Sequence, residues 1–254
     1  MRMTMLDSQN AESAVSRALA VLEALAVSPE PMRLSAIALQ LEMQKSTVHR
    51  ILSTLSQLGY VEQMEATSCY RASLKLWELG VGIVAEHPVK RAASTFIQAL
   101  HRATGETVSL TILSGDDVLY LDKILSPRPI RFTTRVGSRV PAPLTAGGKA
   151  MLAFAPNARA IARRVAPRIK DKRHMEIEAL MRELEKVRTH GYATSSFRPG
   201  VIAFAAPVMG REGQAVAALS VSAPVERANA KKRSEIIEEV MTASANMAER
   251  FGHL

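Results

Sequence analysis

A run of hydroxyl, imidazole and guanidinium side chains between residues 44 and 60 has the chemistry to contact nucleic acid. Lys45 and Arg50 are its only formally charged residues, and no Asp or Glu occurs in it. On a helix of about 100° per residue, the polar side chains collect on one face. That face carries Ser46, His49, Arg50, Ser53 and Gln57, opposite an apolar stripe of Val48, Ile51, Leu52, Leu55 and Leu58. Hydroxyls and cations contact phosphates and base edges, whereas a carboxylate would be repelled. The pattern indicates a DNA-reading face, the alternative being an ordinary solvated helix face.

The elements before this face predict a helix-turn-helix. Residues 13–26 form an amphipathic pattern with Val15, Leu19, Leu22 and Ala26 at helical spacing. A second helix fits 35–41 with Ser35 as N-cap, a short turn follows at 42–44, and the third helix begins near Ser46 and ends at Gly59. This order places the third helix where a recognition helix enters the major groove. Two packed helices also occur in many all-α proteins, and the polar face of the third helix favours DNA reading.

Two short strands, 60–63 and 69–72, follow the third helix around a polar turn. A hairpin in this place is the wing of a winged helix-turn-helix, and Arg71 on it could reach backbone phosphate. Residues 74–86 then form a largely apolar helix that includes Trp77. A second subunit is the natural cover for such a helix, so we expect it to connect the domains and to dimerise.

The remaining chain predicts an α+β domain. Strands are expected at 108–113, 118–124, 131–136, 201–208 and 215–222, and helices at 88–103, 146–154, 176–190 and 230–251. Hairpins packed with helices in this way suit a small-molecule sensor.

Charge and composition narrow the class further. The 254 residues are 47% hydrophobic, which is typical of a globular protein with about two domains. Residues 123–173 hold 13 basic residues and one acidic residue, which indicates a basic surface or anionic ligands. Cys69 is the only cysteine, which excludes an intramolecular disulfide and a multi-cysteine zinc site. We see no secretory signal and no membrane-length apolar run, so a cytoplasmic location without membrane contact is expected.

Enzyme signatures fail on their context. Residues 80–85 match a dinucleotide-binding pattern but lie inside an apolar helical stretch, and Gly148-Lys149 lacks the rest of a phosphate loop. The histidines show no metal-ligand spacing. We therefore expect no catalysis, cofactor or metal. The alternative is a small-molecule-binding enzyme on the C-terminal domain, with the N-terminus used for assembly.

Several sequence blocks resemble the IclR family of bacterial transcriptional regulators. They run in family order from residue 13 and include LSAIALQLEMQKSTVHRILSTLSQLGY at 34–60, LWELG at 76–80, TGET at 104–107, VLYLD at 118–122, TAGGKA at 145–150 and AAPV at 205–208. The resemblance implies an N-terminal winged helix-turn-helix domain (11–73, with the helix-turn-helix at 35–57). It also implies a linker and dimerisation helix (74–87) and a C-terminal GAF-like α/β effector domain (88–254).

The resemblance also implies the partners. Family members bind double-stranded, palindromic operator DNA as homodimers or dimers of dimers, and small organic acids control that binding. The DNA contacts it implies are Arg17, Ser35, Lys45, Ser46, Thr47, His49 and Arg50, to which the wing adds Arg71.

The effector pocket implied by the resemblance is formed by Ala146, Gly147, Ser195, Ser196, Ala203, Ser220 and Ser222. The amides that begin the helix at Ala146 are a ready carboxylate site. This chain lacks the usual acidic residues at 195–200 and carries Ala203-Phe204 where relatives often have a polar residue. We therefore expect a more apolar and more positive pocket for a monocarboxylate with a hydrophobic or aromatic body.

Overall fold

The computed structural model describes residues 13–128, 134–169 and 176–251. The chain divides into two compact units, Met1–Ile83 and Val84–Leu254. Among the helices of the described ranges, none is both long and apolar enough to cross a membrane.

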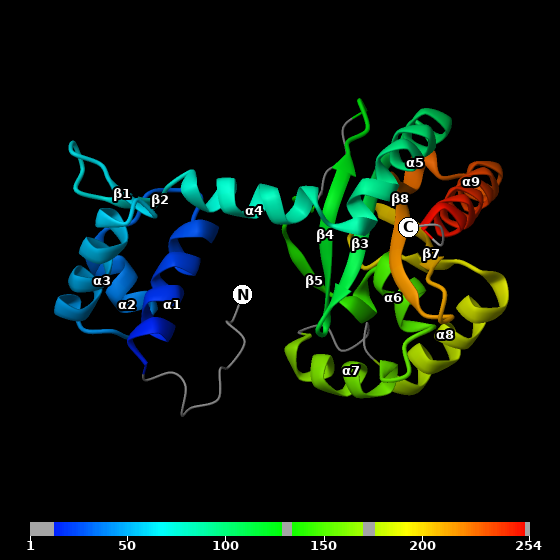
Figure 1. Cartoon of the computed structure of the whole chain (residues 1–254). Coiled ribbons are helices and arrows are strands. Elements are labelled where there is room, and N and C mark those ends of the chain that lie inside the picture. The colour runs from blue at the N-terminus through cyan, green and yellow to red at the C-terminus, as the bar shows by residue number, and fades with distance from the viewer. Residues whose placement is uncertain (1–12, 129–133, 170–175, 252–254) are drawn as a thin grey trace. The chain divides into compact units, whose positions relative to one another are not determined.

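The N-terminal unit is a winged helix-turn-helix, as the sequence predicts. It consists of α1 (Ala14–Val27), α2 (Leu34–Gln40), α3 (Lys45–Gln57), β1 (Val61–Gln63) and β2 (Tyr70–Ala72), and the two strands pair antiparallel (Figure 1). Val21, Ile37, Val48 and Leu52 are fully buried at the centre of its core. These side chains come from α1, α2 and α3, so one small core fixes all three helices.

The apolar stripe predicted for α1 is confirmed only at Leu22, which packs against the core. Val15 and Leu19 are 69% and 54% exposed, and α1 buries Ala20, Val21, Ala24 and Leu25 instead. Apolar residues occupy most of the circumference of this helix, so their spacing does not single out the face that packs on α3. Leu58, predicted in the stripe of the third helix, is likewise 54% exposed at the C-terminal end of α3.

Helix α4 (Lys75–Ala85) has no buried residue in the single chain. Its large apolar side chains lie in solvent, with Trp77 64% and Ile83 73% exposed. Exposed apolar surface of this kind marks an interaction site more often than an ordinary surface.

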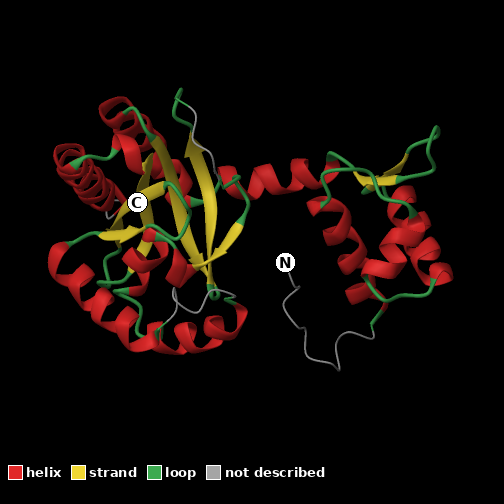
Figure 2. Cartoon of the chain, turned by 180° about the vertical axis from the view of Figure 1, so that it is seen from behind, coloured by secondary structure: helices red, strands yellow, loops and turns green. Residues whose placement is uncertain are grey.

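The C-terminal unit is built around an antiparallel sheet. Its elements are α5 (Pro88–Thr104), β3 (Thr107–Ser114), β4 (Asp117–Ile124), β5 (Arg139–Pro141), η1 (Ala142–Leu144), α6 (Ala146–Leu152), α7 (Ala158–Val165), η2 (Ala166–Arg168), α8 (Ile177–His190), β6 (Ala193–Ser195), β7 (Val201–Met209), β8 (Ala215–Pro224), η4 (Val225–Arg227) and α9 (Ala230–Phe251). In the described ranges the sheet has six strands in the order β5-β4-β3-β8-β7-β6. Figure 2 shows this sheet in yellow.

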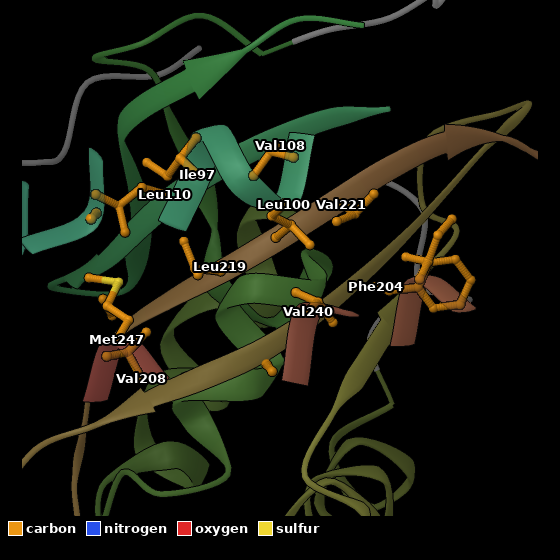
Figure 3. Packing of buried hydrophobic residues seen from close by; sticks show 14 of the residues in the cluster. Ile97, Leu100, Val108, Leu110, Phe204, Val208, Leu219, Val221, Val240 and Met247 are labelled. Atoms are coloured by element: carbon orange, nitrogen blue, oxygen red, sulfur yellow. The ribbon is translucent and has the colours of Figure 1, made fainter. Parts of the chain in front are cut away.

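Helices cover both faces of this sheet. On one face α5 and α9 pack against Val108, Leu110, Leu219 and Val221, which point into a hydrophobic core (Figure 3). On the other face α6, α7 and α8 form a second core with the sheet. The α+β architecture that the sequence predicts is therefore confirmed.

The third predicted strand was misplaced. Residues 131–133 of it lie outside the described residues, and residues 134–136 form no strand. The chain turns at Gly137, which has φ +82° and donates its N–H to Tyr120 O, and only then pairs with β4 as β5. The prediction also missed α7 and β6, whose short lengths give little periodic signal.

Candidate DNA interface and ligand pocket

The polar face predicted for the third helix is exposed on α3. Ser46, His49, Arg50, Ser53 and Gln57 are all solvent-exposed. Beneath them Val48 and Leu52 are fully buried against α1 and α2. The first turn of α3 carries no acidic residue, so the positive end of its helix dipole is not offset there.

The start of α3 differs slightly from the prediction. The helix begins at Lys45 with Gln44 as N-cap, and no side chain caps it, so Ser46 is not the N-cap. Lys45 and Ser46 are exposed and Thr47 is half-buried. Ser35 is likewise inside α2, whose N-cap is Arg33. The hydroxyls of both serines are therefore free of a capping role.

The other predicted DNA contacts lie on separate elements of the same unit. Arg17 is half-buried on α1, and its buried Nε has no hydrogen-bond partner among the described residues. Arg71 is exposed on β2 and pairs with Glu62 on β1 at 2.7 Å. Both side chains of that pair are about half exposed, so water screens their attraction.

A cavity in the C-terminal unit lies between the sheet and the start of α6. Its volume is about 60 Å³, space on the order of five water molecules. The described residues that line it are Thr107, Ser109, Thr111, Tyr120, Lys123, Thr134, Thr145, Ala146, Gly147, Ser195, Phe197, Arg198, Val201, Ala203, Ser220 and Ser222.

The floor of the cavity is a ladder of hydroxyl groups on β3 and β8. Ser109 pairs in register with Ser220, and Thr107 pairs with Ser222. Alternate residues of a strand face the same side, so Thr107, Ser109 and Thr111 share the cavity face. Between them Val108 and Leu110 face the α5–α9 core (Figure 3). The sequence prediction missed the β3 hydroxyls, although their alternation with apolar residues was a visible signal.

A β-bulge brings two β4 side chains into the cavity together. Tyr120 and Lys123 are three residues apart, so they would face opposite sides of a regular strand. The register shifts between Leu110 and Thr111, which leaves Tyr120 opposite Thr111 and Lys123 opposite Ser109. Both therefore line the cavity.

Two cations reach the cavity from different elements. Lys123 comes from β4, and its Nζ donates to Thr134 Oγ1 at 2.6 Å. Arg198 comes from the β6–β7 connection and lies over the Phe197 ring, 4.9 Å from its centroid.

Burial lowers the pKa of Lys123 to about 8. Burial also raises the pKa of the Tyr120 phenol, which a hydrogen bond with Thr134 and the Arg198 charge oppose. No Asp or Glu is among the described lining residues, so the cavity suits an anion.

Glycines let α6 approach the sheet and η1 closely. A Cβ on Gly147 would lie 2.6 Å from Thr111 Oγ1, and a Cβ on Gly148 would lie 2.0 Å from Ala142 O. Thr145 caps α6 by accepting the Gly148 N–H at 2.9 Å. The TAGGKA block thus packs the start of α6 on β3, beside the hydroxyl ladder.

Most of the predicted effector residues meet in this cavity. Ala146, Gly147, Ser195, Ala203, Ser220 and Ser222 line it. Ser196 instead lines a neighbouring cavity of about 240 Å³ between α6 and α8, where Lys149 pairs with Glu183 at 2.7 Å. Phe204 is on the opposite face of the sheet, in the α5–α9 core, so it adds no apolar surface to the pocket (Figure 3).

The excess charge of residues 123–173 is partly neutralised. Arg164 pairs with Asp116 of the β3–β4 turn at 2.7 Å, Arg168 pairs with Asp117 at the start of β4 at 3.1 Å, and Arg159 pairs with Glu178. A basic surface over α7 is therefore weaker than the sequence count indicates. Within the described ranges no cluster of three His, Cys, Asp or Glu side chains could hold a metal ion.

Comparison with known proteins agrees with this arrangement. The sequence pattern of the IclR helix-turn-helix domain matches residues 14–65, and that of the bacterial transcriptional regulator IclR C-terminal domain matches residues 81–249. The probable transcriptional regulator SauR of Cupriavidus necator is 33% identical over 251 residues, which cover 96% of this chain and 99% of SauR. The transcriptional regulator KdgR of Escherichia coli is 32% identical, with coverage of 98% and 96%. The crystal structure of Thermotoga maritima IclR superposes with a TM-score of 0.77 at 25% identity, covering 94% and 98%.

A winged helix-turn-helix unit joined to a domain with its own pocket defines a DNA-binding transcriptional regulator with a ligand-binding C-terminal domain. The chain belongs to the IclR family of these regulators. This membership makes it a regulator and not an enzyme, and it gives no support to the enzyme alternative.

Proposed function

We propose that the protein binds a palindromic operator as a homodimer or dimer of dimers, and that a small organic acid in the cavity controls this binding. The observation that carries the DNA part is the exposed, acid-free face of α3. The proposed division is residues 11–73 for DNA binding, 74–87 for linking and dimerisation, and 88–254 for effector binding. Access to bacterial DNA requires a cytoplasmic location.

In this proposal the start of α3 contacts phosphate and its middle reads bases. Lys45, Ser46 and Thr47 lie on the first turn, where backbone amides and cations favour phosphate oxygens. His49 and Arg50 follow on the exposed face, and Arg50 has the forked geometry that reads guanine. Arg17, Ser35 and Arg71 would contact the backbone beside the groove. Releasing Arg71 from its exposed pair with Glu62 costs little.

The exposed apolar surface of α4 supports dimerisation. A helix with Trp77, Leu79, Val81 and Ile83 more than 40% exposed gains by covering them against a second copy. Each removed Å² of apolar surface contributes about 25 cal/mol. Two recognition helices one helical turn apart then match a palindromic operator.

Control by an acid follows from the electrostatics of the cavity. Lys123 and Arg198 bring positive charge to a wall that has no carboxylate among its described residues. The predicted residues Ala146, Gly147, Ser195, Ala203, Ser220 and Ser222 form the other walls, with Ser196 adjacent. The acid would favour one arrangement of the dimer and so change the spacing of its two α3 helices.

Fluorescence anisotropy tests the proposal. The purified protein is titrated onto the duplex that lies upstream of its own gene and onto a scrambled duplex, at two salt concentrations. A preference for the native duplex that persists at the higher salt supports sequence-specific binding. Equal and salt-sensitive binding to both would contradict it for this duplex.

A matched pair of variants tests the recognition face. Arg50→Ala should weaken specific binding by about 1–3 kcal/mol if Arg50 reads a base. Arg102→Ala removes the same charge from the exposed end of α5 and should leave operator affinity unchanged. Equal affinities of Arg50→Ala and the wild type would remove Arg50 from the interface.

A further inference from the structure

Ser109 carries a buried hydroxyl that faces the cavity. The residue is 3% exposed and lines the cavity from β3. Its backbone carbonyl accepts a hydrogen bond from the Ser220 hydroxyl at 3.4 Å, which joins the two serines across β3 and β8. A serine hydroxyl on a cavity wall can contact an oxygen of a ligand.

Lys123 lies directly opposite Ser109 on the neighbouring strand. The two residues are paired in the β3–β4 register, and the bulge at Leu121 turns Lys123 to the same side as Ser109. Nζ of Lys123 is held by the carbonyl and hydroxyl oxygens of Thr134. These two hydrogen bonds fix the position of the ammonium group at the wall of the cavity. An anionic oxygen placed between Lys123 and Ser109 would accept a charge-assisted hydrogen bond from each.

The floor beyond Ser109 offers more hydroxyls in a fixed geometry. Ser220 is the register partner of Ser109 on β8, one strand further from Lys123, and neighbouring strands are about 4.8 Å apart. Ser222 lies two residues along β8, opposite Thr107. A carbon chain that starts at Lys123 and crosses this floor would set its own oxygens against the hydroxyls of Ser220 and Ser222. A ring without substituents would set carbon against them.

We propose that Lys123 and Ser109 bind the carboxylate of the effector, and that the effector is a short hydroxylated acid whose other oxygens contact Ser220 and Ser222. This assignment rests on the proposed function, in which this cavity is the effector site. It also changes the expected class from a monocarboxylate with an aromatic body to an oxygen-rich aliphatic acid.

Calorimetric titration of the full-length protein with matched small molecules tests the class. Glycerate and threonate carry both a carboxylate and hydroxyls, propionate and butyrate carry only the carboxylate, and glycerol and threitol carry only hydroxyls. At least one of the first pair should bind about tenfold or more tightly than its two partial analogues. Glycerol and threitol lose the charge-assisted hydrogen bonds of the carboxylate, and propionate and butyrate lose the hydrogen bonds to Ser220 and Ser222. Benzoate tests the aromatic alternative, and tighter binding of benzoate would overturn the proposed class.

Variants locate the contact. Lys123→Met and Ser109→Ala should weaken binding of the tightest acid by about tenfold or more and about threefold or more, respectively. Lys123→Arg keeps the charge and should retain most of the affinity. Lys149→Met is the matched control, since Lys149 lies on the neighbouring cavity beside Glu183. Loss of binding in Lys149→Met with retention in Lys123→Met would overturn the assignment.

A measurement on the wild type guards against variants that fail to fold. Acetylation of lysines by a water-soluble ester, read by peptide mass spectrometry, should be slowed at Lys123 by the acid and unchanged at Lys149. Operator release is followed in parallel. An acid that releases DNA from the wild type and from Lys123→Met alike supports the proposed function and refutes this contact. Absence of binding and of DNA release by every acid would refute both.

Discussion

Replacement of Gly148 by alanine should distort the ligand pocket through a backbone clash. The added Cβ would lie 2.0 Å from the carbonyl oxygen and 2.6 Å from the carbonyl carbon of Ala142. Real Cβ atoms stay at least 3.0 Å from such atoms, so α6 and η1 must separate by at least about 1 Å. No rotamer change relieves this contact, because both partners are backbone. The displaced α6 carries the Ala146 and Gly147 wall of the cavity with it.

The magnitude follows from two opposing effects. Overpacking a core costs about 1–3 kcal/mol, and a backbone clash belongs at the upper end of that range. Alanine gains about 1 kcal/mol over glycine in a helix. The net loss is about 2 kcal/mol, equivalent to a decrease in Tm of about 4–8 °C for a domain of this size.

Differential scanning calorimetry of Gly148→Ala against Ser234→Ala checks this reasoning. Ser234 is exposed in α9 of the same unit, so its replacement by a better helix former should be neutral or raise stability by roughly a few tenths of a kcal/mol. Equal Tm values for Gly148→Ala and the wild type would show that η1 yields without cost and would refute the argument.

Three further changes have defined outcomes. Glu106→Gln should cost about 1.5–3 kcal/mol in urea unfolding, because Glu106 is 2% exposed and accepts two charge-assisted hydrogen bonds from Arg227, whose side chain is partly exposed, and the exposed Glu226→Gln should cost little. Burial lowers the pKa of Lys123 to about 8, so the ammonium loses its proton as the pH rises through 8. The affinity for the acid, measured by titration between about pH 7 and 9.5, should therefore fall above pH 8 in the wild type. It should stay constant in Lys123→Arg, whose charge persists throughout this range. The same pH dependence of affinity in both proteins would exclude Lys123 as the contact of the carboxylate. Ser220→Leu fills the cavity and should abolish the acid response while anisotropy shows unchanged operator binding, and loss of operator binding by the folded variant would contradict the pocket assignment.

The recognition helix was predictable because its signal is local. Within α3 the apolar residues cover one face, so the helical period alone predicts that Ser46, His49 and Arg50 are exposed. In α1 the apolar residues cover most of the helix, and the choice between Leu19 and Val21 depends on tertiary packing. Neither helix propensity nor the helical spacing of apolar residues determines which of these two residues is buried.

The pocket was predictable only in part. Resemblance located Ala146, Ser220 and Ser222, whereas Lys123 and Tyr120 require knowledge of the bulge, which depends on pairing between β3 and β4. Phe204 was misassigned because adjacent residues of a strand face opposite sides, and Ala203 already occupies the cavity side.

The extra residue in β4 has a consequence for how this pocket can change. Successive residues of β4 face opposite sides of the sheet, and the extra residue at Leu121 shifts this alternation by one position. The ammonium group of Lys123 therefore lies on the cavity side among hydroxyl groups. Asp122 lies on the α5 side, where it pairs with Lys90. A one-residue deletion there would turn Lys123 to the α5 side of the sheet, and its neighbours on β4 would change face with it. Ligand preference in this fold can therefore change through the insertion or deletion of one residue in β4 as well as through substitution.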